Sequence, residues 1–406
     1  MSDFIIYASL FISLYFEVFL LITFFEGESK SIDTAKSTNL YTPSVTVIVP
    51  CWNEENTIAG TLNSLLKLKY QKNKLDIIVV DDGSTDNTLA VAKSFAHNEQ
   101  VRVFTKENGG KHSAMNFALS KTDSEIVGCL DADSFVDPDA MLNLVQHFKD
   151  ESIASVTPSI KIHNAKGILQ IIQKAEYGVS VFLRKVFVAL DAQFITPGPF
   201  SFFRRTALDK IGYWQNAHMT EDLEIGLRMQ KHHMRVENEP SAVVYTTAPA
   251  TLHALHKQRV RWTYGFLRNA WDYRFMFFNK EYGNLGLIIL PMAVVSVFVG
   301  IYITLFAVVT VLSSITEKII QISEVGLTFH MPTFDIFYVN TATITIITFV
   351  VIIGTFVTMA LGKRLTKDDV FTADSVAYLA LYGFIAPLWL TSATAKALSG
   401  IKINWR

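Results

Sequence analysis

The sequence predicts an α/β domain, built on a mostly parallel sheet flanked by helices, between one apolar N-terminal helix and about three apolar C-terminal helices. Half of the 406 residues are hydrophobic, the mean hydropathy is +0.28, and the excess apolarity is concentrated at the two ends of the chain. Between Tyr41 and Pro249, short β-branched runs alternate with amphipathic stretches, the pattern of strands joined by helices. The length exceeds one ordinary core. The predicted regions are 1–28 (transmembrane helix), 29–249 (cytosolic domain), 250–283 (interfacial helices) and 284–406 (transmembrane region).

Residues 4–25, FIIYASLFISLYFEVFLLITFF, form the first apolar run. It is long enough to cross roughly 30 Å of hydrocarbon as a helix. A cleaved signal peptide would begin with basic residues and end at small ones, whereas only Asp3 precedes this run and Phe24-Phe25 ends it. We therefore expect an uncleaved transmembrane helix. Glu17 within it either packs against other helices or lies on a substrate path.

Three further apolar runs cover residues 285–312, 336–361 and 376–395, and a segment with Glu317, Lys318 and Glu324 between the first two is expected to be interfacial. Positive side chains flank the first three of the four runs on one side: Lys30, Lys36, Arg268, Arg274, Lys363 and Arg364. This bias predicts a multi-pass cell-membrane protein whose central domain is cytosolic. The tail 396–406 disagrees, because four crossings would put its positive charges outside. Either the last run is not a full span or the tail is an exception.

Within the central domain, strands are predicted at residues 44–50, 75–82, 101–105 and 125–133. Helices are expected to begin after Asn53, at Asp86, near Lys111 and at Pro138. An α/β fold of this order binds its ligand in the crevice outside the carboxyl ends of the strands.

The net charge of −1 gives no global field that would attract nucleic acid, so an anionic substrate must be held by local positive groups. Cys51 and Cys129 are too far apart in sequence for a zinc pattern or a disulfide framework, which fits a reducing cytosolic location.

Polar clusters follow three of the predicted strands, at residues 51–55, 81–86 and 131–134. One such cluster could be helix capping, but three around one crevice indicate a binding site. Asp131 and Asp133, spaced i, i+2, can flank one cation, and Mg²⁺ or Mn²⁺ prefers such oxygen ligands together with substrate phosphates. A lone pair of this kind is more often a solvated turn. Lys111, after Gly109-Gly110, strengthens the metal interpretation because its ammonium can meet a phosphate.

Residues 256–266, HKQRVRWTYGF, place arginines and a tryptophan about twenty residues before an apolar run. Such side chains often anchor a chain at the headgroup level, and position alone does not separate an anchor from a site.

Six segments occur in a fixed order: VIVPCWNEE, VVDDGSTD, ENGGKHSAMNFAL, LDADS, TED and QRVRW. With them the chain resembles the membrane-integrated glycosyltransferases of family 2, a group that includes cellulose, hyaluronan, chitin-oligosaccharide and poly-N-acetylglucosamine synthases. The resemblance covers about residues 42–270 by motif and the flanking helices by layout.

The resemblance implies a GT-A-like fold and an inverting, metal-dependent transfer of a sugar from a nucleotide-diphosphate sugar. The expected donor is UDP-N-acetylglucosamine or UDP-glucose, and GDP-mannose ranks after them. The acceptor would be a growing membrane-associated polysaccharide, which would pass through a small helical channel. Accessory export subunits would be possible partners. Two alternatives stay open: transfer of a single sugar to a polyprenyl-linked acceptor, and a degenerate domain that only binds nucleotide sugar. The second predicts the loss of a catalytic carboxylate, and Asp131, Asp133 and Asp222 are all present.

The resemblance also assigns roles by position. Asp222 would be the general base with Glu221 beside it, and Asp131 and Asp133 would hold nucleotide and metal. Arg261 would meet the pyrophosphate, while Trp262, with Gln258, would form the floor under the acceptor sugar. The remaining nucleotide-sugar contacts would come from Pro50, Asn53, Glu54, Asp82 and Lys111. Among these, Asp82, with the neighbourhood of Asn53 and Glu54, would contact the nucleotide base. Arg259 is expected to point elsewhere, as an interfacial or lipid-phosphate anchor. The stretch 198–203 resembles the loop that lines the acceptor site.

Overall fold

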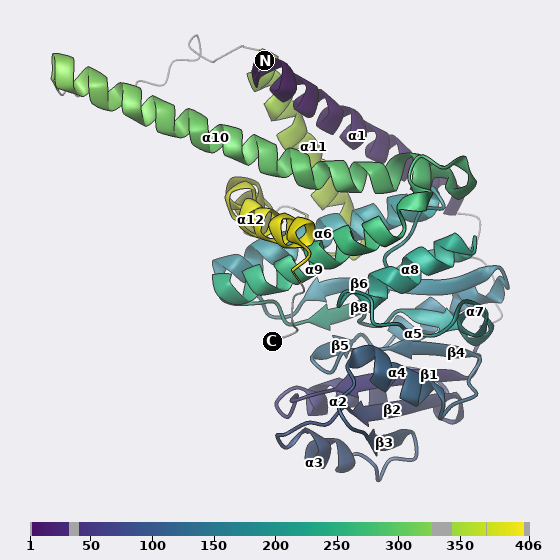
Figure 1. The fold of residues 1–406 in the computed structure, drawn as a ribbon. Coiled ribbons are helices and arrows are strands. Elements are labelled where there is room, and N and C mark those ends of the chain that lie inside the picture. The colour runs from purple at the N-terminus through teal and green to yellow at the C-terminus, as the bar shows by residue number, and fades with distance from the viewer. Residues whose placement is uncertain (1, 32–39, 327–342, 371, 402–406) are drawn as a thin grey trace.

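The computed structural model describes residues 2–31, 40–326, 343–370 and 372–401. It is arranged in three tiers (Figure 1): a sheet with its covering helices, a middle tier of long helices, and a group of apolar helices on top.

The described residues form one eight-stranded sheet of order β3-β2-β1-β4-β7-β6-β8-β5. Its strands are β1 (Val45–Cys51), β2 (Leu75–Asp81), β3 (Val101–Thr105), β4 (Ile126–Cys129), β5 (Ser134–Val136), β6 (Ile153–Ile162), β7 (Phe202–Arg204) and β8 (Arg235–Thr246). The first four are parallel to one another, as predicted, but β7 runs antiparallel between β4 and β6. The sheet is therefore mixed.

The predicted strand 125–133 is shorter in the structure. β4 ends at Cys129, and the chain then turns, with the backbone N–H of Ser134 donating to the carbonyl of Asp131 at 3.0 Å. The residues after the turn form β5, which pairs antiparallel with β8. The two aspartates of the motif consequently lie in a turn between two strands.

Helices cover both faces of the sheet. They are α2 (Ile58–Leu66), α3 (Thr88–Lys93), α4 (Lys111–Leu119), α5 (Ala140–Val145), α7 (Arg205–Ile211) and α8 (Glu221–Lys231), with short 3-10 turns at Lys72–Lys74, Gln146–Lys149, Arg274–Met276 and Lys280–Tyr282. Alternate residues of β1 pack into two separate hydrophobic cores, one on each face of the sheet. Val47 and Val49 pack with α2 and α5, while Ile48 packs with α4 and α8. Burial on both faces explains why these strands are apolar throughout.

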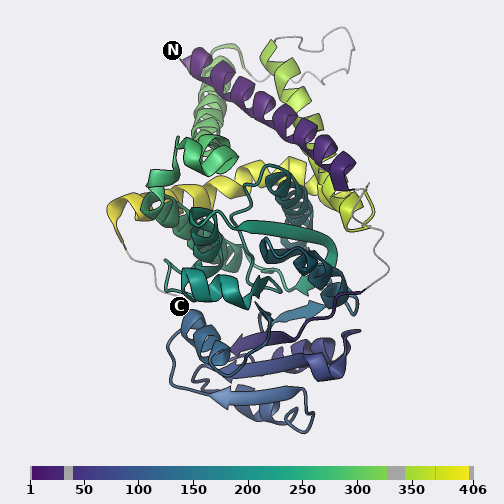
Figure 2. The same cartoon turned by 90° about the vertical axis from the view of Figure 1, so that its right-hand side faces the viewer.

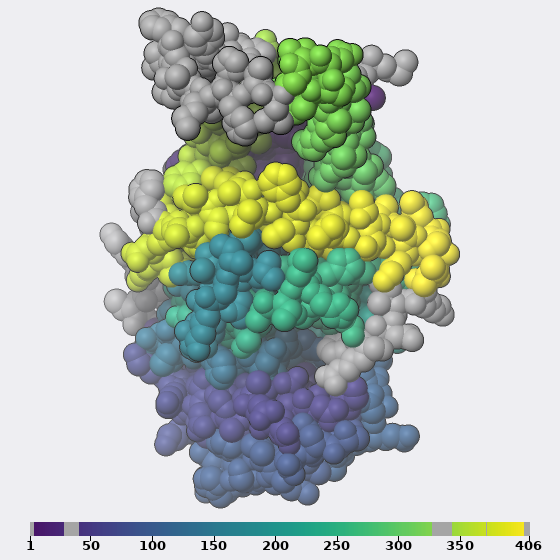
Figure 3. Space-filling model, turned by 90° about the vertical axis from the view of Figure 1, so that its left-hand side faces the viewer, coloured from purple at the N-terminus to yellow at the C-terminus, as the bar shows by residue number. Residues whose placement is uncertain are grey.

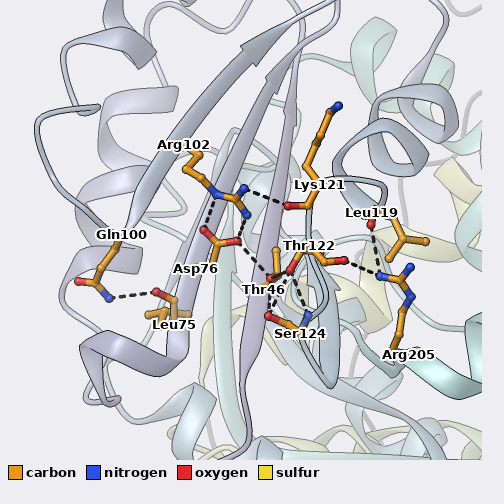
Figure 4. A network of polar contacts seen from close by, with 10 residues as sticks. All are labelled: Thr46, Leu75, Asp76, Gln100, Arg102, Leu119, Lys121, Thr122, Ser124 and Arg205. Carbon is orange, nitrogen blue, oxygen red and sulfur yellow. Dashed lines mark hydrogen bonds and ion pairs between the residues drawn. The ribbon is translucent and has the colours of Figure 1, made fainter.

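A polar network closes the amino ends of the first strands (Figure 4). Thr46 at the start of β1 hydrogen-bonds to Thr122 at 2.7 Å, and Arg102 donates to Asp76 at 3.0 Å. Arg205 donates to the carbonyl of Thr122 at 2.7 Å. The opposite, carboxyl ends are left for the polar clusters that the sequence singles out.

The middle tier consists of α6 (Ile168–Ala189), α9 (Leu252–Asp272) and α12 (Ala373–Ser399). α12 packs on both α6 and α9 (Figure 3). Its buried contacts with α9 join Leu255, Val260, Tyr264, Ala386, Trp389 and Ala393. The helix that carries QRVRW is thus covered by the last apolar segment of the chain.

Among the described residues, four helices are long and apolar enough to cross a membrane. They include α1 (Ser2–Ser31), α10 (Leu290–Val325, preceded by a π-helical turn at Leu285–Ile289) and α11 (Thr343–Leu365). α1 and α11 both contact α6. Phe24 stacks on Phe182 at 5.1 Å between ring centroids, and a Cβ on Gly362 would overlap the carbonyl oxygen of Gly178. These contacts lie near the helix ends that carry the flanking positive residues.

Two predicted spans differ in extent. α10 continues through Glu317, Lys318 and Glu324, which the sequence assigned to a separate interfacial segment. Its last turns contain no proline or glycine, and it ends at Gly326, whose φ is +79°. The predicted span 336–361 begins outside the described residues, and its described part belongs to α11.

The fourth candidate span, α12, lies crosswise to α1 and α11 and along the top of the α/β domain (Figure 2). This orientation favours the first of the two explanations for the tail, in which the last apolar run is not a full span.

Candidate active site

The polar loops after β1 and β2 are locked together. Thr85 donates its backbone N–H to Oδ1 of Asn53 at 2.8 Å, and the backbone N–H of Glu54 donates to Oγ1 of Thr88 at 2.7 Å. Asn53 has a positive φ of 57°, which a short polar side chain tolerates. Pro50 lies in β1 opposite Val80 of β2. The residues predicted to contact the nucleotide base therefore lie together at the carboxyl ends of β1 and β2.

Asp82 is buried and holds the glycine turn before α4. Its carboxylate accepts backbone N–H groups of Gly109 at 3.1 Å and of Gly110 at 2.8 Å, and pairs with Lys106 at 2.8 Å. Gly110 has a φ of +84°, a conformation that favours glycine. Asp82 thus shapes the loop that presents Lys111, and its contact with a base stays a prediction.

Lys111 begins α4 and forms an ion pair with Asp131. Burial alone would lower the pKa of Lys111, but the carboxylate of Asp131 and other neighbouring groups hold it well above the usual range. The ammonium is therefore charged, as a phosphate-binding group must be.

Asp133 lies close to other carboxylates. Burial, followed by the charges of Asp131 and Glu54, raises the pKa of Asp133 to about 6. Several carboxylates close together favour the binding of a cation, and their oxygen atoms are ligands that suit Mg²⁺ or Mn²⁺. Within the described ranges no three His, Cys, Asp or Glu side chains converge on one point. The protein would supply two carboxylates, and the phosphates of a donor would have to complete the shell.

Asp222 lies in the first turn of α8 and is fixed by a loop before β7. Its Oδ1 accepts the N–H of Leu223 at 3.0 Å, and its Oδ2 accepts the N–H of Gly198 at 3.3 Å. Burial, together with the charge of Glu221, raises the pKa of Asp222 above that of an ordinary aspartate, while Lys111 and Arg261 act in the opposite direction.

A small pocket lies between Lys111 and Asp222, and Asp131 and Asp133 do not line it. Its lining comes from α4, the end of β4, the 196–201 segment, β7, the loop after α7 and the start of α8: Lys111, Met115, Cys129, Thr196, Pro197, Gly198, Ser201, Phe203, Trp214, Glu221 and Asp222. A cation and a carboxylate thus line one pocket. A transfer reaction needs both, the cation for a negatively charged leaving group and the carboxylate as proton acceptor.

α9 is held tightly against the turn that precedes Asp222. A Cβ on Gly265 would overlap Oγ1 of Thr220, and Asn269 donates to that same oxygen at 2.9 Å. This packing brings Arg261 near enough to act electrostatically on Asp222. The charge of the Arg261 guanidinium thus acts on Asp222, and its contact with a diphosphate stays a prediction.

The other residues of that motif are placed differently. Gln258 and Trp262 are both half-buried on α9, and Oε1 of Gln258 has no hydrogen-bond partner among the described residues. The expectation for Arg259 is wrong. It is only 5% exposed and pairs with Glu176 of α6 at 2.6 Å, so it cannot serve as a lipid-phosphate anchor. The partner lies 83 residues away in sequence, which spacing within the motif could not reveal.

Two contributors escaped the sequence analysis. Glu176 is an acidic residue on α6, a helix whose apolar spacing could have marked it as amphipathic. Gly198 was noted only as part of a loop, yet a Cβ there would lie 2.6 Å from Nζ of Lys111 and 3.2 Å from Oδ2 of Asp131.

Known proteins resemble the chain in sequence and in fold. A poly-beta-1,6-N-acetyl-D-glucosamine synthase of Staphylococcus epidermidis is 29% identical over 407 aligned residues, 98% of this chain and 94% of the relative. The synthase of the same name from Staphylococcus aureus is 34% identical over 268 residues, 65% of each chain. The mannosyltransferase PcManGT from Pyrobaculum calidifontis, solved with GDP-Man and Mn²⁺, superposes with a TM-score of 0.61 over 99% of this chain and 100% of its own, at 17% identity. That likeness confirms the predicted GT-A-like fold. Residues 43–265, more than half of the chain, match the family described as "Glycosyltransferase like family 2", and the chain belongs to that family.

Proposed function

We propose that the protein transfers N-acetylglucosamine from UDP-N-acetylglucosamine to the end of a growing poly-N-acetylglucosamine chain at the membrane, with inversion at the anomeric carbon. Family membership and the synthases related over nearly the whole chain support nucleotide-sugar-dependent polysaccharide synthesis. The observation that carries the site assignment is that Asp222 and Lys111 line one pocket, with the charge of Arg261 acting on Asp222.

In the proposed reaction, a hydroxyl oxygen of the acceptor attacks the anomeric carbon of the donor sugar. The new bond forms on the face opposite the bond that breaks, which joins that carbon to an oxygen of the nucleoside diphosphate. Asp222 takes the proton of the hydroxyl. Its raised pKa suits this role, because a base closer to neutral pH accepts a proton more readily at the start of the attack.

The departing diphosphate gains negative charge, and two cations of the chain can balance it. Lys111 begins α4 next to the glycine turn, and Arg261 approaches from α9. Arg261 can also bind two phosphate oxygens at once through its planar guanidinium. Preorganised charges of this kind usually contribute most to the rate.

A Mg²⁺ or Mn²⁺ ion fits Asp131 and Asp133, whose crowding raises the pKa of Asp133 to about 6. Bound there with the donor, the ion would neutralise the diphosphate as a Lewis acid. Asp131 and Asp133 would hold it, while Asn53, Glu54, Asp82 and Pro50 would surround the nucleotide.

We further propose that the α/β domain faces the cytosol and that α1, α10 and α11 cross the membrane. The ends of α1 and α11 that carry Lys30 and the pair Lys363-Arg364 lie toward α6 and the sheet, and positive residues favour the cytosolic side. The acceptor would then be a saccharide held at the bilayer surface, and export subunits could join from the membrane.

A donor screen with the detergent-purified protein tests the function. UDP- and GDP-sugars are supplied in turn with Mg²⁺ or Mn²⁺, and nucleoside diphosphate release and product length are recorded. We expect release from UDP-N-acetylglucosamine and a ladder of products or a high polymer. Addition of one sugar to a polyprenyl phosphate would support the alternative transferase, and no turnover of any donor would contradict both.

A further inference from the structure

Arg259 and Trp262 lie on one face of α9 and touch. The guanidinium carbon of Arg259 is 4.3 Å from the centroid of the Trp262 ring, and the two residues are spaced i, i+3. A guanidinium over an indole is attracted by the electron-rich face of the ring. Because Arg259 is buried, this contact closes one face of Trp262, and a sugar can stack only on the other.

Glu176 determines where Arg259 lies. Its Oε2 accepts a hydrogen bond from Nη2 of Arg259 at 2.6 Å, across the α6–α9 interface. A buried charge of this kind is strongly tied to its partner, since removing the partner leaves it uncompensated. The position of the Trp262 ring is therefore linked to a carboxylate on another helix.

The second oxygen of Glu176 is also engaged. Its Oε1 accepts the hydroxyl of Tyr382 from α12 at 3.0 Å. Tyr382 is itself packed, stacked on Tyr378 at 4.4 Å and edge-on to Trp389 at 5.8 Å between ring centroids. Both oxygens of the carboxylate are thus fixed, one by the QRVRW helix and the other by the helix that lies across it.

We propose that Glu176 is a positioning residue for the acceptor: it holds Arg259 flat against Trp262 and so sets the height and tilt of the surface on which the acceptor sugar stacks. This inference rests on the proposed function through the role of Trp262. It adds that α6 and α12, whose described residues do not line the pocket between Lys111 and Asp222, control acceptor binding through the series of contacts Tyr382, Glu176, Arg259, Trp262.

The test is a two-substrate kinetic measurement on the full-length protein in detergent. The probes are radiolabelled UDP-N-acetylglucosamine and a soluble β-1,6-linked N-acetylglucosamine tetrasaccharide. Glu176→Gln keeps the shape of the side chain but removes its charge. We expect the KM for the tetrasaccharide to rise about fivefold or more, the size of a lost cation–π contact, with the KM for the donor unchanged. Arg259→Lys removes the planar guanidinium that lies on the Trp262 ring, and we expect the same rise in the KM for the tetrasaccharide.

The matched control is Tyr378→Phe, which removes a hydroxyl from the same aromatic cluster but leaves both hydrogen bonds of Glu176 in place. It should leave both KM values unchanged. Equal losses toward donor and acceptor in Glu176→Gln would indicate a merely structural role and overturn the inference, as would two unchanged KM values in a folded variant.

Two more variants separate the possible failures. If Glu176→Gln does not fold, Tyr382→Phe tests the inference in its place. It removes the hydrogen bond from Tyr382 to Glu176 and keeps the ion pair between Glu176 and Arg259. An acceptor KM unchanged in that variant overturns the inference. Trp262→Ala tests the role on which the inference rests. A silent Trp262→Ala removes the acceptor floor from the proposed function and the inference with it, whereas an impaired Trp262→Ala beside a silent Glu176→Gln removes the inference alone.

Discussion

The backbone N–H of Gly198 donates to Oδ2 of Asp222 at 3.3 Å, and the same glycine lies against the ion pair between Lys111 and Asp131. One residue therefore touches both the proposed base and the proposed diphosphate-binding group. Because Gly198 has no side chain, Lys111 and Asp222 can both lie close to its backbone.

Gly198→Ala should slow transfer. The added Cβ would stand 2.6 Å from Nζ of Lys111, so the ammonium must move away from the position it needs. Misplacement of this size costs roughly tenfold to a hundredfold in rate. Initial rates are compared with those of Gly167→Ala, where a Cβ meets nothing within 4 Å. An unchanged rate in Gly198→Ala would show that the site tolerates the shift.

The pH dependence of transfer should reveal Asp222. A general base works only when deprotonated, and burial and Glu221 raise the pKa of Asp222. The rate should therefore fall on acidification at a pH above the value of about 3.9 typical of aspartate. Glu221→Gln should move this acidic limb to lower pH, because it removes a neighbouring negative charge. The profile is recorded at saturating Mn²⁺, so that the ion outcompetes protons at Asp133. A rate that stays flat down to about pH 4 contradicts the assignment.

Asp133→Ala should weaken the binding of UDP only when metal is present. Loss of a carboxylate next to the ion removes one of two protein ligands, and changes even beyond the ligands typically cost about 10- to 100-fold in metal affinity. Calorimetry with UDP, with and without Mn²⁺, measures the difference, and Asp139→Ala at an exposed position is the control. Equal UDP affinity of Asp133→Ala and the unchanged protein in Mn²⁺ counts against the metal site.

Arg261→Lys separates a diphosphate clamp from a membrane anchor. As an anchor, lysine should serve as well as arginine. As a clamp, it replaces a planar fork with a point charge and should cost about 10²-fold in rate. Arg274→Lys, near the end of the same helical region, is the control and should be almost silent. Matched amounts of monodisperse protein are compared by initial rate. If both Arg261→Lys and Trp262→Ala turn over near the original rate, the anchor interpretation stands.

The parallel half of the sheet could be predicted because its strands are apolar on both faces and polar residues lie at or just after their ends, as at Asp81 and Asp131. The other half, which mixes parallel and antiparallel pairs, could not. β7 has only three residues, Phe202–Arg204, and it is defined by pairing with two strands that lie far away in sequence. Helix α10 extends beyond its apolar core because nothing before Gly326 stops it, although charges at Glu317 and Lys318 suggested an end.

In the site, position within short motifs pointed to Asp222, Lys111 and Arg261, because each of these assignments rests on a local segment of the sequence. The placement of Arg259 failed for the opposite reason. Whether an arginine next to a membrane faces lipid or protein depends on a partner, and Glu176 belongs to a different helix whose docking no local pattern describes. The contact of Gly198 with Lys111 likewise depends on where a distant loop returns to the sheet.

Asp222→Asn tests the central claim most directly. The amide keeps the shape of the side chain but cannot take the proton of the acceptor, and loss of a general base typically costs about 10²- to 10⁴-fold. The measurement pairs the initial rate of sugar transfer with the affinity for UDP in Mn²⁺, both on monodisperse protein, with Asp209→Asn at the surface as control. We predict transfer reduced at least about a hundredfold with UDP affinity nearly unchanged. Transfer above about a tenth of the original rate would contradict the role of Asp222 and, with it, the proposed reaction.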